Sequence, residues 1–366
     1  MSEKEKKKVS GKRIALIFLI IFLAIVLVVL VAGTIFVTGT LNKLSRPEQN
    51  VTLSPSEIEA LLNEEDDVQE EPDYVVETEE TTPGVTEETL EVISPEDLAI
   101  LETPVEQITS DENKDNFINI LLVGQDARDP DKRQRSDSMI LCTLNKSTKT
   151  LTMTSFMRDM YVKIPGHYNQ RMNVAYMVGG FDALYDTLEY NFGVDVDQGV
   201  AVNFQSFTKV VNAVGGVDIE LSDAEARYIN SKDSSFGLKE GMNHLSGAPA
   251  LWYARTRKVG GGGDFDRSNR QRILISAIID KLKAMSLIDL YNLVDELLPM
   301  VYTDMSNAEI VAMVMELAPM LQDLQIVSQR IPLDDGYRMT MVDGMSVLMP
   351  DLQKSRNFLA ETIGGI

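Results

Sequence analysis

The chain has very few of the side chains on which most zinc and nucleophilic chemistry depends. Its 366 residues include two histidines, one cysteine and one tryptophan. Cys142 stands alone, so it forms no internal disulfide, and its place in an apolar run favours a small buried group. His167 and His244 are too few for a histidine-based zinc site, and a Ser-His-Asp triad would have to use one of them. The composition therefore argues against both chemistries.

Phosphate-binding loops of the nucleotide-binding kind are also missing. Gly260 to Gly263 is a run of four glycines, but no Gly-Lys-Ser/Thr follows it. No Gly-x-Gly-x-x-Gly follows an apolar run either. These absences exclude a nucleotide-binding fold, and the glycine run alone predicts only a flexible connector.

Lysine and arginine are absent between Arg46 and Lys114, and this gap explains the net charge. The segment from Glu48 to Glu112 contains 22 of the 56 acidic residues, and the remaining 34 equal the 34 Lys and Arg. Such a segment buries too little apolar surface to offset the entropy of ordering, so it predicts a disordered spacer. It serves either as a self-repelling stalk or as a passive linker. Short helices are expected after Ser54 and Ser94, each followed by Pro.

A charge-free run near the N-terminus predicts a membrane anchor. Ile14 to Val37 contains no charged residue and is long enough to cross about 30 Å of hydrocarbon. A cleaved signal peptide would have a shorter apolar region of about 7–15 residues, although Ala32-Gly33-Thr34 resembles a cleavage site. The basic residues before the run place the N-terminus in the cytoplasm and the remainder outside the cell. The low cysteine content is compatible with a Gram-positive surface protein.

Apolar periodicity divides the rest of the chain into alternating strands and helices. The predicted organisation is a cytoplasmic tail (1–13), a transmembrane helix (14–37), a disordered extracellular stalk (38–115) and a folded domain (116–366). Strands are expected at 117–123, 138–144, 151–156, 200–204, 217–221, 324–331 and 345–348. Helices are expected at 173–191, 207–214, 247–256, 266–283, 286–298, 307–321 and 350–362. This mixture predicts a three-layer α/β or α+β domain.

Acids and arginines lie where the first three predicted strands end. Asp126, Arg135 and Asp137 stand in the first loop, and the third strand runs into Arg158 and Asp159. Carboxylates can hold a hard divalent cation, whereas arginines bind phosphate oxygens in bidentate fashion. Each charge alone would be an ordinary solvated loop residue, but together they predict a pyrophosphate site.

A second charged cluster follows the predicted helix at 247–256. Arg255, Arg257 and Lys258 precede the glycine run, and Asp264, Arg267 and Gln271 come after it. Arg267 and Gln271 are four residues apart, so they share one face near a helix N-terminus, where anions are favoured. We expect this arginine patch and the Asp137–Arg158 patch to meet around one diphosphate.

Taken together, these motifs resemble the LytR-CpsA-Psr (LCP) family. The matching stretches occur in the family's order from about 117 to 283 and again near the C-terminus. They are LLVGQDAR (121–128), RSDSM (135–139), FMRDMYV (156–162), RMNVAY (171–176), GG (179–180), GGVD (215–218), LSG (245–247), YARTRK (253–258), DFDR (264–267), RQ (270–271) and MSVLMPD (345–351). Departures are Gln125 where Ser is common and Met157 where Pro is common.

The resemblance implies a three-layer α-β-α domain with a central mixed sheet and a hydrophobic tunnel for a polyprenyl chain. It also implies a metal-dependent phosphotransferase in the cell membrane. Such an enzyme moves a glycopolymer from undecaprenyl pyrophosphate to peptidoglycan and has no nucleic-acid partner. By position, Asp126 and Asp137 would hold Mg²⁺ or Mn²⁺. The pyrophosphate would be held by Arg135, Arg158, Arg255, Arg257, Arg267 and Gln271, with Asp264 beside them.

Several alternatives stay open at the level of sequence. Asp126, Asp137 or Asp264 could take the proton of the attacking hydroxyl. Water could replace the acceptor, which would make the protein a polyprenyl-pyrophosphate pyrophosphatase. A non-catalytic lipid-binding regulator, of the kind labelled a transcriptional attenuator, is a further alternative. The glycopolymer itself could be a teichoic acid, a capsule or another wall polysaccharide.

Overall fold

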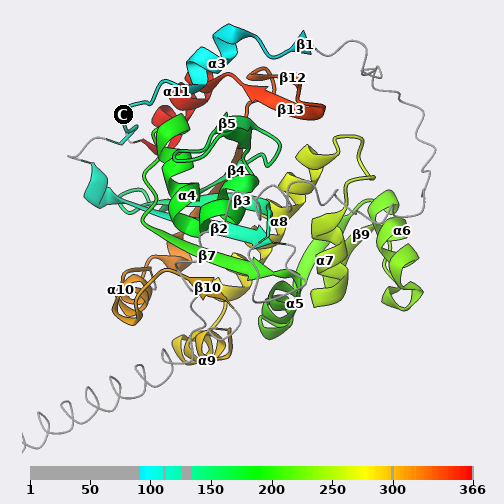
Figure 1. Cartoon of the computed structure of the whole chain (residues 1–366). Helices are drawn as coiled ribbons and strands as arrows, with labels where there is room; N and C mark the ends of the chain where they lie inside the picture. Colours follow the sequence, from blue (N-terminus) through cyan, green and yellow to red (C-terminus); the bar gives the residue numbers. More distant parts are fainter. Residues whose placement is uncertain (1–90, 110–112, 126–133, 298–300, 318, 365–366) are drawn as a thin grey trace, which may run out of the picture.

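The computed structural model describes residues 91–109, 113–125, 134–297, 301–317 and 319–364 (Figure 1). The predicted tail (1–13), the membrane span (14–37) and the stalk up to residue 90 lie outside these ranges. Within them, no helix combines the length and the apolar character needed to cross a membrane.

A six-stranded mixed sheet forms the centre of the fold. Its strands, in spatial order, are β10 (Tyr302–Thr303), β7 (Gln198–Asn203), β2 (Phe117–Gln125), β3 (Ser136–Asn145), β4 (Thr150–Phe156) and β11 (Gln325–Ile331). The first three predicted strands are therefore confirmed as neighbours. β2 pairs antiparallel with β3 and parallel with β7, and β4 pairs antiparallel with β3 and parallel with β11. As a result, β2, β4, β7 and β11 all end at the same edge of the sheet.

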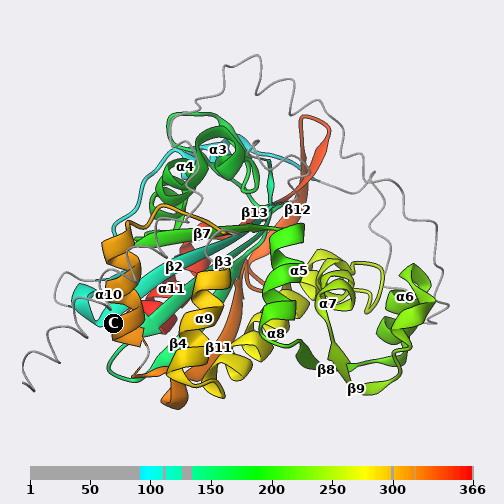
Figure 2. The same cartoon turned by 90° about the horizontal axis from the view of Figure 1, so that it is seen from below.

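Helices lie on both faces of this sheet, as the predicted three-layer architecture requires. The main helices are α4 (Val174–Phe192), α5 (Phe204–Ala213), α7 (Gly247–Arg255), α8 (Asp264–Lys283), α9 (Leu287–Leu297), α10 (Asn307–Leu317) and α11 (Leu352–Ile363). Of these, α5 and α7 do not cover the sheet but pack in a second hydrophobic core with Val217, Tyr228 and Leu245. Figure 2 shows α4 and α8 on opposite sides of the sheet. The alternation of strand side chains explains this: Leu121 packs in the cluster that contains α4 and α11, whereas Ile140 packs in the cluster with Ile275 of α8.

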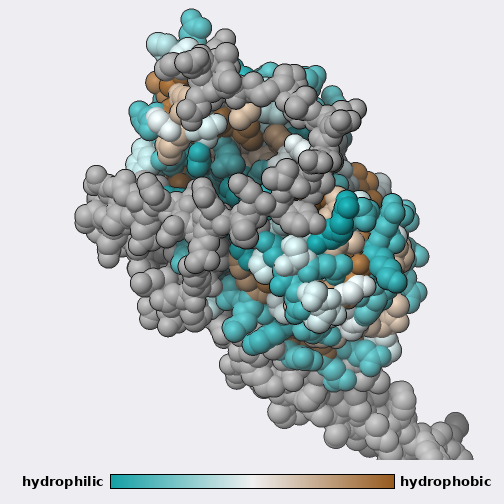
Figure 3. All heavy atoms as spheres, turned by 90° about the vertical axis from the view of Figure 1, so that its right-hand side faces the viewer, coloured by the Kyte–Doolittle hydropathy of each residue, from teal (hydrophilic) through white to brown (hydrophobic). Residues whose placement is uncertain are grey.

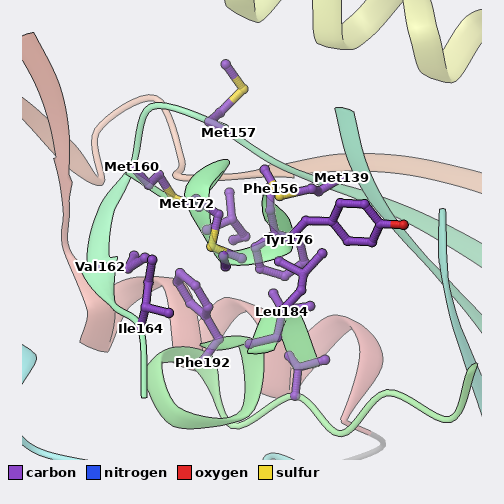
Figure 4. Close-up of a cluster of buried hydrophobic side chains, with 14 of the residues drawn as sticks. Met139, Phe156, Met157, Met160, Val162, Ile164, Met172, Tyr176, Leu184 and Phe192 are labelled. Carbon is purple, nitrogen blue, oxygen red and sulfur yellow. The ribbon is translucent and has the colours of Figure 1, made fainter. Parts of the chain in front are cut away.

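Methionine and aromatic side chains fill the layer between the sheet and α4. Met139, Phe156, Met160 and Met172 are each at most 2% exposed and lie against Tyr176 and Phe192 (Figure 4). These methionines are therefore core residues. Because methionine has three rotatable bonds and a polarisable sulfur, it fills irregular space and adapts more easily than a branched residue.

The folded part begins earlier than the sequence predicted. β1 (Glu91–Val92) pairs with β12 (Tyr337–Val342), and α3 (Pro95–Leu101) follows it. The helix starts as expected, since Ser94 and Asp97 form a reciprocal capping box. Leu101 is 1% exposed and belongs to the main core. The predicted stalk boundary at 115 is therefore wrong. The acidic composition suggested disorder up to that residue, whereas residues 91–109 are ordered by contacts with the rest of the domain.

Several short elements carried no clear periodicity and were missed. They are β5 (Tyr161–Lys163), β6 (Asn169–Arg171), α6 (Asp223–Lys232), β9 (Gly241–Leu245) and β12. β9 pairs with the predicted strand β8 (Val217–Leu221), and β12 pairs with β13 (Met345–Pro350) in a separate sheet. A signal for α6 was present, since Ser222 and Glu225 form a capping box at its start.

Hydrophobic residues also appear on the surface. Figure 3 shows one face of the molecule, where brown residues are visible among hydrophilic ones in the upper part. Among the residues that the structure describes, the most exposed large hydrophobic side chain is Met242, at 69%. Single exposed hydrophobic residues are normal on soluble domains and by themselves indicate no site.

The corrected boundary gives a direct stability test. Leu101→Ala removes a fully buried side chain, so the free energy of unfolding should fall by about 2–5 kcal/mol. Ile100 is its neighbour in the same helix and is 54% exposed, so Ile100→Ala is a matched control with little expected effect. Denaturant unfolding of both variants measures the difference. Equal stability of the two variants would show that residues 91–109 do not belong to the folded domain.

Candidate active site

The predicted charged residues meet at the edge where the parallel strands end. Asp137 is the second residue of β3, Arg158 follows the end of β4 by two residues, and Asp264 begins α8. In open α/β sheets, ligands bind outside the carboxyl ends of the strands, and this edge corresponds to that position. The topology therefore brings segments more than a hundred residues apart to one place.

Arg158 lies among three carboxylates. Its Nη1 donates a 2.7 Å hydrogen bond to Asp137 Oδ1, and its Nε lies 3.6 Å from Asp159 Oδ2 and 3.7 Å from Asp264 Oδ1. Burial alone would lower the pKa of Arg158, but the three carboxylates outweigh burial and raise it above the ordinary arginine value. Arg158 is therefore a permanent cation held in a fixed position.

The arginines of the second cluster, Arg257 and Arg267, contact Asp137 and Asp264 as well. Arg257 Nε lies 3.5 Å from Asp264 Oδ1, and its Nη2 lies 3.9 Å from Asp137 Oδ1. Arg267 Nη2 donates to the backbone oxygen of Asp137 at 3.0 Å and to Asp264 Oδ2 at 3.1 Å. Burial lowers the pKa of Arg267 to about 10. The expected meeting of the two patches is confirmed.

A pocket opens between these residues. It is lined by Asp137, Ser138, Met139, Ser155, Phe156, Met157, Arg158, Asp264, Arg267, Ser268 and Gln271. Three buried polar atoms of its lining have no hydrogen-bond partner in the described structure: Nε of Arg158, Nε of Arg267 and Oδ1 of Asp264. Asp264 Oδ1 nevertheless lies 2.8 Å from Arg267 Nη2 and 3.7 Å from Arg158 Nε, so these atoms are ion-paired without forming a hydrogen bond. Buried polar groups are normally hydrogen-bonded, so the pocket retains hydrogen-bonding capacity for a ligand.

Three predicted residues that the structure describes do not line the pocket. Arg257 is one of them, and it reaches the site through its ion pairs with Asp137 and Asp264. Arg255 does not line the pocket, because its guanidinium lies 4.4 Å from the ring of Phe204 and 5.3 Å from that of Trp252. Arg135 immediately precedes β3 and does not line the pocket either, although its charge acts on Tyr168. Asp126 lies outside the described residues.

The glycine run is more than a flexible connector. A Cβ on Gly260 would lie 2.4 Å from Asp266 Oδ2, and one on Gly262 would lie 2.5 Å from Asp266 Oδ1. The amide of Gly262 donates to Asp266 Oδ2 at 2.8 Å. Gly260 also has φ +101°, which other residues rarely adopt. The loop therefore wraps closely around one carboxylate as the chain enters α8.

Other residues of the site were not selected from the sequence. Arg171 Nε lies 3.8 Å from Asp159 Oδ1, and its Nη2 donates to the backbone oxygen of Ser346 at 2.6 Å. Its position in the stretch RMNVAY was the available signal. Ser155 and Ser268 line the pocket, but isolated serines carry no recognisable pattern, so no signal pointed to them.

Two carboxylates of the pocket are of the kind that binds hard divalent cations. Asp137 and Asp264 share three arginine neighbours, and Asp264 Oδ1 accepts no hydrogen bond of good geometry. Carboxylate oxygens are the ligands that Mg²⁺ prefers. Among the residues described, no group of three or more His, Cys, Asp or Glu is placed to hold a metal. The two carboxylates fit as part of such a site.

A three-layer α/β domain with arginines and carboxylates around a pocket defines an anion-binding protein with the capacity for phosphate chemistry. Comparison makes the class specific: the chain belongs to the LytR_cpsA_psr family, whose model matches residues 89–363.

Known relatives carry the name polyisoprenyl-teichoic acid–peptidoglycan teichoic acid transferase. TagT of Bacillus subtilis is 38% identical over 188 residues, which cover 50% of this chain and 58% of TagT. TagU of Bacillus licheniformis is 42% identical over 171 residues, which cover 46% of this chain and 53% of TagU. The alignments thus span about half the length of these relatives.

Solved structures agree with the fold. The structure of the LytR-CPS2A-psr family protein YwtF (TagT) with bound octaprenyl pyrophosphate lipid superimposes with a TM-score of 0.54 and 28% identity. The match covers 72% of this chain and 97% of that protein.

The geometry predicts pyrophosphate binding that depends on Arg257. Arg257→Ala should weaken the affinity for inorganic pyrophosphate by about 10-fold or more, because one charge-assisted contact is lost. Arg227 pairs with Asp223 on α6 and is 57% exposed, so Arg227→Ala is the control. Isothermal titration calorimetry measures both. Equal affinity in both variants would show that Arg257 does not contact the anion.

Proposed function

We propose that this protein transfers a glycopolymer from a polyprenyl pyrophosphate carrier to peptidoglycan and leaves a phosphodiester link. The observation that carries the proposal is the convergence of Arg158, Arg257 and Arg267 on Asp137 and Asp264 at one pocket, which Arg158 and Arg267 line. The Nε atoms of these two lining arginines make no hydrogen bond in the described structure. The relatives' names supply the substrate class, since they are teichoic acid transferases acting on peptidoglycan.

A lipid carrier needs an apolar sleeve beside its charged end. Met139, Phe156 and Met157 line the charged pocket and also belong to the main hydrophobic core (Figure 4). This core extends between the sheet and α4 through further methionines, whose flexible side chains can repack around a chain. We place the polyprenyl tunnel in this layer, with its charged mouth at Arg158.

The reaction makes one phosphorus–oxygen bond and breaks another. A sugar hydroxyl of peptidoglycan attacks the phosphorus that bears the glycan, the anhydride bond breaks, and polyprenyl phosphate leaves. Arg158, Arg257 and Arg267 neutralise the charge that grows on the phosphate oxygens in the transition state. Asp137 or Asp264 accepts the hydroxyl proton, since both face the pocket.

A divalent cation, Mg²⁺ or Mn²⁺, fits this scheme. Asp137 and Asp264 would hold it together with Asp126, and it would supply further neutralisation of the phosphate oxygens. The carboxylates and arginines pair with one another in the free protein. Binding of the cation to the carboxylates and of the pyrophosphate to the arginines would replace these pairs. A cation on the carboxylates would leave the arginines available to the pyrophosphate.

The proposal also includes the location. The charge-free run at 14–37 anchors the chain in the membrane with its N-terminus in the cytoplasm. The folded part then stands outside the cell, where the pyrophosphate of the carrier and the peptidoglycan are both accessible.

Two substitutions test the assignment. Arg158→Ala and Asp137→Ala should each lower the rate of glycopolymer transfer by about 10²–10³-fold. The first removes a cation that neutralises the transition state, and the second removes the carboxylate that holds Arg158 and that would bind the cation or accept the proton. The assay follows transfer from a polyprenyl-pyrophosphate-linked glycan to peptidoglycan, with circular dichroism to check the fold. Parent-like turnover in either folded variant would refute the assignment. Release of free glycan phosphate without an acceptor would instead identify a pyrophosphatase.

Metal removal provides a separate test. Chelation with EDTA should abolish transfer, and added Mg²⁺ or Mn²⁺ should restore it, because the carboxylates then lose and regain their cation. Activity that persists at full rate after chelation and dialysis would remove the metal from the mechanism while leaving the arginine assignment intact.

A further inference from the structure

Arg272 lies behind the wall of the charged pocket. It is 5% exposed and belongs to the third turn of α8. Its Nη1 donates to Ser155 Oγ at 2.6 Å and to Ser268 Oγ at 2.9 Å, and its Nη2 donates to Asn269 Oδ1 at 3.3 Å. Arg272 is therefore surrounded by neutral oxygens.

The charge of Arg272 is not compensated within the described structure. No carboxylate lies within salt-bridge distance of it there, and the charged neighbour that influences it is Arg330, another cation. Burial and Arg330 lower the pKa of Arg272 to about 10. Arg270 shows the ordinary arrangement, because it is equally buried but lies 2.7 Å from Glu225. A buried cation without a counterion is unfavourable, so this position requires an explanation.

The two serines connect Arg272 to the pocket. Ser155 comes from β4 and Ser268 from α8, and both line the pocket together with Arg158 and Arg267. Each hydroxyl oxygen accepts from Arg272, so its own proton remains to be donated. No acceptor for either proton is found among the residues described. Both protons are therefore available to an acceptor in the pocket.

We propose that Ser155 and Ser268 form a phosphate subsite, in which both hydroxyls donate to a non-bridging oxygen and Arg272 is the positioning residue behind them. The inference rests on the proposed function, because it takes the pyrophosphate of the carrier as the ligand. Arg272 donates hydrogen bonds to both hydroxyl oxygens, which leaves the hydroxyl protons directed away from it. The positive charge of Arg272 is compensated once the anion binds. In addition to the contacts from Arg158 and Arg267, the anion would thus receive hydrogen bonds from Ser155 and Ser268.

The affinity for inorganic pyrophosphate tests this subsite in the detergent-solubilised full chain. Ser155→Ala and Ser268→Ala should each weaken binding by about 10-fold in calorimetry, because each removes one hydrogen bond to a charged group. Arg272→Met should weaken binding by at least as much as either serine variant. Ser355 is a fully buried serine of α11 outside the pocket, so Ser355→Ala is the matched control and should bind like the parent. Parent-like affinity in both serine variants would overturn the proposal.

Thermal unfolding separates this role from a structural one. Arg272→Met removes a buried charge that lacks a counterion, so the Tm of the unliganded variant should equal or exceed that of the parent. The increase in Tm on adding pyrophosphate should be smaller in the variant than in the parent. A lower unliganded Tm with an unchanged pyrophosphate-induced increase would mean that Arg272 only supports the fold.

The transfer assay distinguishes failure of this subsite from failure of the proposed function. If the parent transfers glycopolymer but the serine variants bind pyrophosphate normally, only the subsite is lost. If the parent binds pyrophosphate through Ser155, Ser268 and Arg272 but transfers nothing to peptidoglycan, the subsite stands and the transferase proposal fails.

Discussion

The pairing of arginines with two shared aspartates is the interaction on which the site depends. Asp137 and Asp264 each lie within 4 Å of Arg158, Arg257 and Arg267. Three cations this close would repel one another without the carboxylates, and two half-buried carboxylates would also be unfavourable without the arginines. The free protein thus holds its binding groups in place by mutual neutralisation. A ligand that brings both negative and positive charge can replace these pairs without leaving any charge alone.

The sheet topology makes this pairing possible. β3 begins beside the point where β2 and β4 end, so the strand order alone places Asp137 near Arg158. α8 then packs on the opposite face from α4 and presents its first turn to the same edge. The methionine-rich layer and the charged pocket meet at Phe156 and Met157, where a polar head and an apolar tail of one molecule would find adjacent environments.

Sequence reasoning recovered the strands with long apolar runs and the charges at their ends. It succeeded for Asp137 and Arg158 because strand ends can be read from periodicity. It misjudged residues 91–109, because the contacts that order them come from distant parts of the chain: β12 pairs with β1, and the amide of Ile108 donates to the backbone oxygen of Gly193. It placed Arg255 with the phosphate-binding arginines, whereas the rings of Phe204 and Trp252 hold it elsewhere. Whether an arginine contacts an anion or an aromatic ring depends on tertiary packing, which the local sequence pattern does not reveal.

Helix α8 carries charged and neutral contacts of the pocket on one face. Asp264, Arg267, Ser268 and Gln271 follow the helical repeat, and Ile275 one turn later packs under the sheet. Inserting a single residue after Gln271 would rotate one part against the other by about 100°. The spacing between Gln271 and Ile275 therefore couples the pocket wall to the sheet: a substitution at the wall changes one contact, whereas an insertion there would displace all contacts on one side of it.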